Sequence, residues 1–311
     1  MSYIEKVVIA GKTVDVSRYY SIRTGGVPEG KRRRKLDPTP ERIEKANMRH
    51  RTDKLRQLMN ANFTDKEFIS MTLTYRKGEE PESIRQVRQD ASDFVKRLRK
   101  CARLFGVDLK FIYVIGAGMH RRHIHITVNA LPDLAILTGC WIHGHASMTP
   151  LYSGGQYRDL ADYFIKNAKE TKEQEIKLEE QPGQMYVCSR NLTKPKVTTR
   201  IISSKTFREE PQAKKGYYVE KESVWNGYTL AGFPMLRYTL IKERDERDKI
   251  VHLHERPREV FRSGEVLLPD AVCQGWTGHG AEGGSCGCGR KPEGRNTRSP
   301  HCIGDADQRR E

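Results

Sequence analysis

The segment His123-Ile124-His125-Ile126-Thr127-Val128 decides the fold prediction for this chain. Successive side chains of a β-strand point to opposite faces of its sheet, so both histidines and Thr127 lie on one face. Ile124, Ile126 and Val128 lie on the other face and can be buried. Two neighbouring neutral imidazoles on an open face form part of a site for a divalent metal ion. The segment therefore predicts a half-buried strand that carries two metal ligands.

Histidine pairs with one residue between them occur at two further places, His143/His145 and His252/His254. Short patterns of this kind have a real false-positive rate. Glycine, not a hydrophobic residue, separates the first pair, and the second pair lies among charged residues. We expect both pairs to be partly exposed, ordinary histidines.

The composition favours a nucleic-acid partner. The 311 residues include 56 Lys+Arg against 40 Asp+Glu, a formal net charge of +16. A basic excess of this size suits a polyanionic ligand, although a basic surface without any ligand is the plain alternative. The mean hydropathy of -0.73 argues against a membrane protein. Because the N-terminus has no apolar signal core, we expect a cytoplasmic location.

Residues 1–62 are expected to form two short strands about Gly11, followed by a basic helical arm. Thr39-Pro40-Glu41 is typical of a helix start, with a capping residue, a proline and an acid in the first turn. The helix is predicted over about 40–61 and is apolar only toward its end. We expect its basic face to contact DNA phosphates, an ordinary solvated helix being the alternative. The basic run before the helix is predicted to bind DNA as well: Lys31, Arg32, Arg33, Arg34 and Lys35.

Residues 63–175 alternate between strand and helix patterns and are predicted to form the core. The predicted strands are 68–75, 111–115, 122–129 and about 145–151, and the predicted helices are 84–105, about 132–141 and about 156–169. The expected fold class is α+β. We expect a mostly antiparallel sheet of about five strands, with the histidine strand at its centre and helices packed on one side.

Residues 176–262 give weaker signals, and we expect an accessory region packed on the core, with strands at 198–204 and 235–242. Residues 263–311 are rich in Gly, Cys and Arg without periodicity and are predicted to be a disordered tail. The cysteines and histidines of this tail fit no compact zinc pattern, so zinc binding there stays an open alternative.

The helix predicted at 156–169 presents a second polar group. On a helical wheel, Tyr163, Lys166, Asn167 and Asp159 share one arc, opposite the apolar arc. A phenol with a pKa near 10 is a weak nucleophile at neutral pH. A nearby ammonium and a metal-bound substrate would stabilise its developing charge. The structural alternative is that Tyr163 packs at the helix edge while Lys166 extends into solvent.

Three segments in this order, Phe68–Tyr75, the histidine strand and Asp159–Lys166, resemble the three motifs of rolling-circle replication initiators. Those proteins belong to the His-hydrophobic-His (HUH) endonuclease superfamily. The chain is most similar to the filamentous-phage-type replication-associated domain of phages and plasmids. Pro38–Glu41 and Cys188–Pro195 resemble that group too, and the resemblance covers roughly residues 18–245.

The resemblance implies a replication initiator that nicks and rejoins single-stranded DNA at an origin. His123 and His125 would hold Mg²⁺ or Mn²⁺, which polarises the scissile phosphodiester. Tyr163 would attack phosphorus and leave a 5′-phosphotyrosine and a free 3′-hydroxyl, while Lys166 stabilises charge. A relaxase or transposase of the same superfamily would use the same residues. The alternative outside enzymes is a basic DNA-binding protein with a vestigial metal site.

Two consequences of the resemblance concern missing parts. Relatives usually have a third metal ligand, commonly a glutamate a few residues before the first histidine. Here Gly116-Ala117-Gly118-Met119-His120 contains no acid. His120 is the expected substitute, and Asp159 or a more distant acid are the alternatives. The chain also lacks a GxxxxGK[ST] phosphate-binding loop, so unwinding would require a separate helicase.

Overall fold

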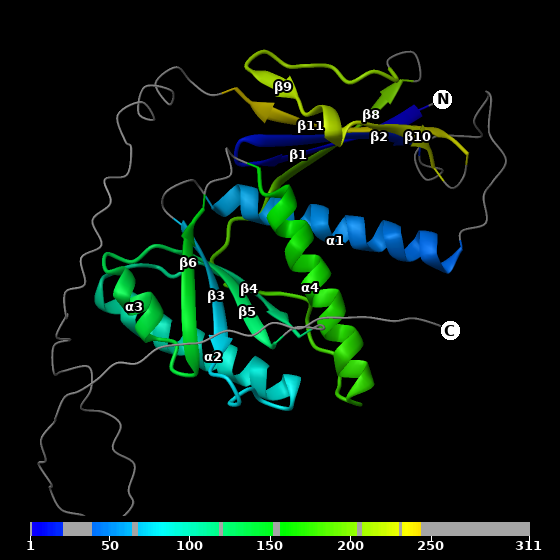
Figure 1. Cartoon of the computed structure of the whole chain (residues 1–311). Coiled ribbons are helices and arrows are strands. Elements are labelled where there is room, and N and C mark those ends of the chain that lie inside the picture. The colour runs from blue at the N-terminus through cyan, green and yellow to red at the C-terminus, as the bar shows by residue number, and fades with distance from the viewer. Residues whose placement is uncertain are drawn as a thin grey trace, which may run out of the picture. The chain divides into compact units, whose positions relative to one another are not determined.

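The structure is a computed structural model. It describes residues 2–20, 39–63, 68–117, 121–151, 156–203, 207–229 and 232–243. Four groups of residues singled out in the sequence lie outside these ranges: the basic run 31–35, His120, the pair His252/His254 and the predicted tail 263–311. Within the described residues, two antiparallel sheets are joined by helices (Figure 1). None of the helices described is long and apolar enough to cross a membrane.

The predicted core is a five-stranded antiparallel sheet with the histidine strand at its centre. The strand order is β6 (Gly144–Pro150), β3 (Phe68–Tyr75), β5 (His123–Asn129), β4 (Phe111–Gly116) and β7 (Val187–Cys188). Every neighbouring pair in this sheet is antiparallel. The predicted α+β fold class and the central place of the histidine strand are therefore confirmed.

One face of this sheet packs against α2 (Ile84–Leu104) and the short helix α3 (Leu134–Gly139). The isoleucines of β5 lie on this face, and Ile124 and Ile126 are fully buried with α2 side chains such as Phe94. The alternation of the histidine strand thus operates as the sequence predicts, because its apolar side chains enter the larger core.

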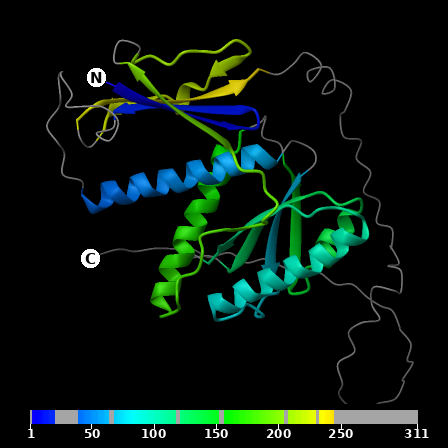
Figure 2. The same cartoon turned by 180° about the vertical axis from the view of Figure 1, so that it is seen from behind.

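The other face is covered by α1 (Pro40–Asn62) and α4 (Arg158–Lys177), which pack on Ile112 and Val114 of β4 (Figure 2). Helices therefore lie on both faces, and the expectation of helices on one side is wrong. The physical reason is in β4, where every residue is buried. A strand that is apolar on both faces needs cover on both faces.

Helix α1 begins where the sequence predicts, because Thr39 caps it by accepting a hydrogen bond from the backbone N–H of Arg42. Its first half is exposed, and its second half is buried through residues such as Leu55 and Met59. Arg56 departs from the expected solvated basic face: its side chain is 2% exposed and pairs with Asp15 at 2.6 Å. The last turns of α1 are thus packed between other elements.

The second sheet combines the two ends of the described chain. Its main path runs β10 (Trp225–Tyr228), β11 (Pro234–Lys242), β2 (Thr13–Tyr20), β1 (Ser2–Ala10) and β8 (Lys196–Ser203), and β9 (Tyr217–Val219) pairs with β11. The predicted strands near 198–204 and 235–242 are present, but their pairing with the first two strands was not anticipated. A separate segmentation into residues 1–62 and 176–262 does not express this pairing, and those boundaries stay predictions.

The hairpin of β1 and β2 approaches α1 closely at Gly11, which has a φ of +57°. A Cβ atom at this position would lie 1.9 Å from the backbone oxygen of Asn60. The side chain of Asn60 in turn donates a hydrogen bond to the hydroxyl of Thr13 at 3.0 Å. Glycine therefore permits both the left-handed turn and the contact between the hairpin and α1.

Candidate active site

The polar face of the histidine strand is open over half of the five-stranded sheet. Antiparallel register places Thr72 of β3 opposite His125, and Ser147 of β6 opposite Thr72. Helix α4 packs over β4, on the other side of β5. On the β6 side, the side chains of His145, Ser147 and Thr149 remain exposed. A polar, accessible strip therefore borders the two histidines.

His123 is held by the chain next to it. Its Nδ1–H donates a hydrogen bond to the backbone oxygen of Arg121 at 2.7 Å. A carbonyl oxygen can only accept, so the ring proton is on Nδ1 and Nε2 keeps its lone pair. A Cβ atom at Gly116, opposite His123 in register, would lie 2.3 Å from this Nε2. Glycine at 116 thus leaves room for the imidazole.

His125 lies deeper, at 7% exposure, and its ring is fixed on both sides. Nδ1 shares a hydrogen bond with Oγ1 of Thr72 at 3.1 Å. Nε2 shares one with the hydroxyl of Tyr163 at 2.9 Å. Burial, and secondly the neighbouring His123, lower the pKa of His125 to about 4. The imidazole is therefore neutral at physiological pH, which is the form that binds metal ions.

Tyr163 reaches the histidines from α4 while remaining 47% exposed. Its neighbour Phe164 is fully buried and stacks on His125, with ring centroids 5.9 Å apart. Two turns later, the hydroxyl of Thr171 lies 2.6 Å from the backbone oxygen of Ile115 and accepts from the N–H of Ala117 at 3.1 Å. These contacts tie α4 to the end of β4 and so fix the phenol beside His125.

The other predicted site residues are less closely engaged. Lys166 is exposed and forms no hydrogen bond or ion pair with the residues that the structure describes. Asp159 is exposed one turn before Tyr163, and no described contact joins it to a histidine. His120 and the basic run 31–35 lie outside the described ranges, so their predicted roles stay predictions.

Among the described residues, no group of three or more His, Cys, Asp or Glu side chains is placed to hold a metal ion. An amide oxygen, however, lies next to the histidine pair. The hypothetical Cβ at Gly116 would lie 3.0 Å from Oδ1 of Asn167, so this oxygen and Nε2 of His123 border the same small space. Nδ2 of Asn167 donates to the backbone oxygen of Tyr163 at 2.9 Å, which orients the amide.

The site thus combines two imidazoles, a phenol and an amide oxygen on one sheet face under one helix. Residues 68–170 match the family model of the replication-associated protein ORF2. The matched segment begins with β3 and ends within α4, so it includes His123, His125, Tyr163 and Lys166. The predicted resemblance to a phage or plasmid replication initiator is confirmed over this segment. Comparison with curated proteins and with solved structures gives no match.

Some features of the matched segment were not found from the sequence. Thr72 supports His125, and its position was available from the alternation of strand 68–75. Asn167 was placed on the arc of Tyr163, but nothing in the sequence showed that its oxygen approaches His123. Gly116 stood out only as a place without an acid, whereas the structure shows that its lack of a side chain accommodates His123.

Proposed function

We propose that the chain is a replication initiator that nicks and rejoins single-stranded DNA at an origin through Tyr163. The observation that carries the proposal is the 2.9 Å hydrogen bond between the Tyr163 hydroxyl and Nε2 of His125. It joins the histidine pair to an exposed phenol in the segment that matches the replication-associated family.

The proposed reaction is a transesterification. As the Tyr163 oxygen bonds to phosphorus, the phenol loses its proton, the bond from phosphorus to the 3′ oxygen breaks, and that oxygen gains a proton. The products are a 5′-phosphotyrosine and a free 3′-hydroxyl that can prime synthesis. The tyrosyl ester keeps the energy of the phosphodiester, so attack by a 3′-hydroxyl rejoins the strand.

The donor atoms beside Tyr163 fit Mg²⁺ or Mn²⁺. Nε2 of His123, Nε2 of His125 and Oδ1 of Asn167 would hold it, since neutral imidazoles and an amide oxygen suit Mn²⁺ and the amide oxygen suits Mg²⁺. When bound, the ion would polarise the scissile phosphate. Thr72 keeps the His125 ring in place from the side opposite Tyr163, a supporting contact typical of metal-binding histidines.

The exposure of Lys166 supports its proposed part in charge stabilisation. It lies three residues after Tyr163, on the neighbouring turn of α4, and its ammonium is free to contact a phosphate that approaches the phenol. The open strip on β3 and β6 gives single-stranded DNA a polar surface on the other side of the histidines. A separate helicase would supply unwinding.

The test is formation of a covalent protein–DNA adduct. Full-length protein is incubated with Mn²⁺ and single-stranded oligonucleotides from its own replicon, and the products are resolved on a denaturing gel. We expect an adduct with the unaltered protein and its loss, by at least about a thousand-fold, in Tyr163→Phe, because no other oxygen takes the nucleophile's place.

Tyr218→Phe is the matched control, because Tyr218 is 49% exposed and lies in the second sheet. This variant should form the adduct as the unaltered protein does. DNA retention without any adduct in the unaltered protein would favour a non-catalytic DNA-binding protein. An undiminished adduct in Tyr163→Phe would show that the nucleophile is another residue.

A further inference from the structure

A polar cavity of about 1040 Å³ lies between α1 and the face of the second sheet that is turned toward it. Sheet faces that pack on a helix are ordinarily apolar. This one presents Ser17, Tyr19 and Arg237 from neighbouring strands, and Lys6 lies opposite Ser17 on β1. Most of the cavity wall comes from outside residues 68–170, the segment that matches the replication-associated family.

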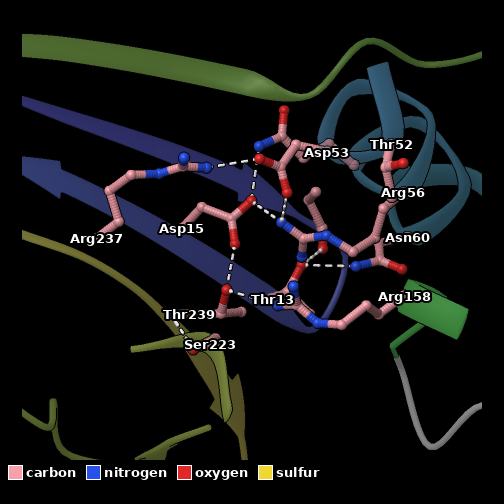
Figure 3. Close-up of polar contacts among 12 residues, drawn as sticks. Thr13, Asp15, Thr52, Asp53, Arg56, Asn60, Arg158, Ser223, Arg237 and Thr239 are labelled. Carbon is pink, nitrogen blue, oxygen red and sulfur yellow. Dashed lines mark hydrogen bonds and ion pairs between the residues drawn. The ribbon is translucent and has the colours of Figure 1, made fainter. Parts of the chain in front are cut away.

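The floor of the cavity is a fixed network of ion pairs (Figure 3). Asp15 accepts hydrogen bonds from Arg56 at 2.6 Å and from the hydroxyl of Thr239 at 2.8 Å. Asp53 accepts from Arg237 at 2.6 Å. Nε and Nη1 of Arg56, a side chain 2% exposed, have no hydrogen-bond partner among the described residues. The acids of the floor are thus already neutralised, while donors remain.

Cations without acidic partners surround this floor. Lys6, Arg49, Lys54 and Lys194 line the cavity and form no ion pair with an acid in the described part of the chain. Burial, and then the charge of Arg237, lower the pKa of Arg49. Burial, and then Lys54, lower the pKa of the adjacent His50. Both shifts reflect a positive potential, which attracts anions.

Aromatic rings complete the wall. Trp225 is half-buried, and the guanidinium carbon of Arg49 lies 5.7 Å from its ring centroid. Tyr19 and Tyr186 line the same cavity and are also half-buried. Cations combined with partly exposed aromatic rings are typical of surfaces that bind single-stranded nucleic acid, where phosphates meet the cations and bases stack on the rings. An acidic peptide would use the cations but not the rings.

We infer that this cavity binds one or two nucleotides of single-stranded DNA, with phosphates on Lys6, Arg49, Lys54 and Lys194 and a base stacked on Trp225. Pockets of about 300–1,000 Å³ enclose drug-sized ligands, so the cavity has room for such a segment. The inference rests on the proposed function for the identity of the nucleic acid. Arg158 lines the cavity from the first turn of α4, the helix that carries Tyr163. The cavity would therefore hold the substrate strand at a second place, away from the cut.

The experiment measures DNA binding apart from cleavage. Full-length Tyr163→Phe protein in EDTA is titrated with a fluorescein-labelled oligodeoxythymidylate, and anisotropy gives Kd. Adding Arg49→Gln and Lys54→Gln should raise Kd by about ten-fold or more and reduce the salt dependence, because removing one phosphate contact lowers the slope of log K against log salt by about 0.7. The matched control, Lys100→Gln with Arg103→Gln, removes the same charge from exposed positions on α2 and should change Kd less than two-fold.

Tryptophan fluorescence tests the stacking contact. Oligodeoxythymidylate should quench Trp225, and Trp225→Phe should remove that quenching while keeping an aromatic ring in place. Equal Kd values in the cavity and α2 variants, or quenching that persists in Trp225→Phe, would overturn the inference. So would quenching by polyglutamate but not by DNA, or tighter binding of duplex than of single strands. Loss of binding in the cavity variants of a protein that never forms an adduct would leave the inference standing and refute the proposed nicking.

Discussion

The two sheets hold their polar side chains in different ways. On the five-stranded sheet, His123 and Tyr163 are partly exposed, and the donor atoms near Gly116 border open space. Under the six-stranded sheet, Asp15 and Arg56 are buried and bound to each other and to neighbouring strands. The difference separates two tasks. A reacting group must stay accessible to its substrate, whereas a binding surface needs a rigid frame from which only the outer cations reach the ligand.

The largest stability effect is expected in the buried frame. Arg56→Met would leave the carboxylate of Asp15, whose side chain is 12% exposed, without its cation. Removing one partner of a buried ion pair costs about 3–5 kcal/mol. Urea unfolding of the two proteins measures the loss.

Arg200→Met is the matched control, because Arg200 also pairs with a buried acid, Glu5, but is itself 68% exposed. Glu5 keeps its bond to Arg18 in that variant. We expect a loss below about 1 kcal/mol. Equal losses in the two variants would show that the network under the six-stranded sheet is not the frame described here.

The next effect concerns pH and the histidine site. Burial lowers the pKa of His125 to about 4, so the folded protein resists a proton that the unfolded chain binds near pH 6.5. Between these values the unfolded state holds more protons, and stability rises with pH. The contribution is complete above about pH 6.5 and lost as pH falls to about 4, a change of roughly 3 kcal/mol.

The measurement is urea unfolding of the metal-free protein from pH 7 to pH 4, beside His125→Asn. The unaltered protein should lose roughly 3 kcal/mol more than the variant over this interval. Identical pH profiles would mean that His125 is not buried as a neutral imidazole.

A third prediction separates two histidines on the same sheet face. His123→Ala removes one proposed ligand and should weaken Mn²⁺ binding by about a hundred-fold, since removing even a supporting contact of a ligand costs about 10–100-fold. His145, on the same face but two strands away at the exposed edge strand β6, is the control. Calorimetry with Mn²⁺ alone should give the same affinity for His145→Ala as for the unaltered protein. A larger loss in His145→Ala would place the metal elsewhere on the sheet.

The smallest effect is expected from the basic run 31–35. Replacing its lysines and arginines by glutamine should flatten the salt dependence of DNA binding by up to about 0.7 in slope for each phosphate that the run neutralises. Unchanged salt dependence would remove this run from the DNA interface and leave the cavity cations as the main electrostatic contact.

Sequence reasoning succeeded where local pattern and packing agree. The alternation in β5, the cap at Thr39 and the apolar spacing of α2 depend on neighbouring residues, and all three are found in the structure. The order of the motifs also identified the segment that matches the replication-associated family.

Long-range contacts were the part that sequence reasoning could not supply. β1 and β8 are separated by most of the described chain, and nothing in either strand specifies its partner. Arg56 looks like any solvated arginine of a basic helix until Asp15 is placed beside it. The approach of Asn167 to His123 depends on how α4 lies on β4, which is set by the contacts of Thr171 with the end of that strand.

The most direct test of the central claim is to find the amino acid that becomes attached to DNA. Adduct formed with Mn²⁺ and an origin oligonucleotide is digested with nuclease and protease, and the peptides are sequenced by mass spectrometry. The account predicts a nucleotide linked through a 5′ phosphate to the Tyr163 oxygen. Attachment to another side chain, or to Tyr163 through a 3′ phosphate, would contradict it.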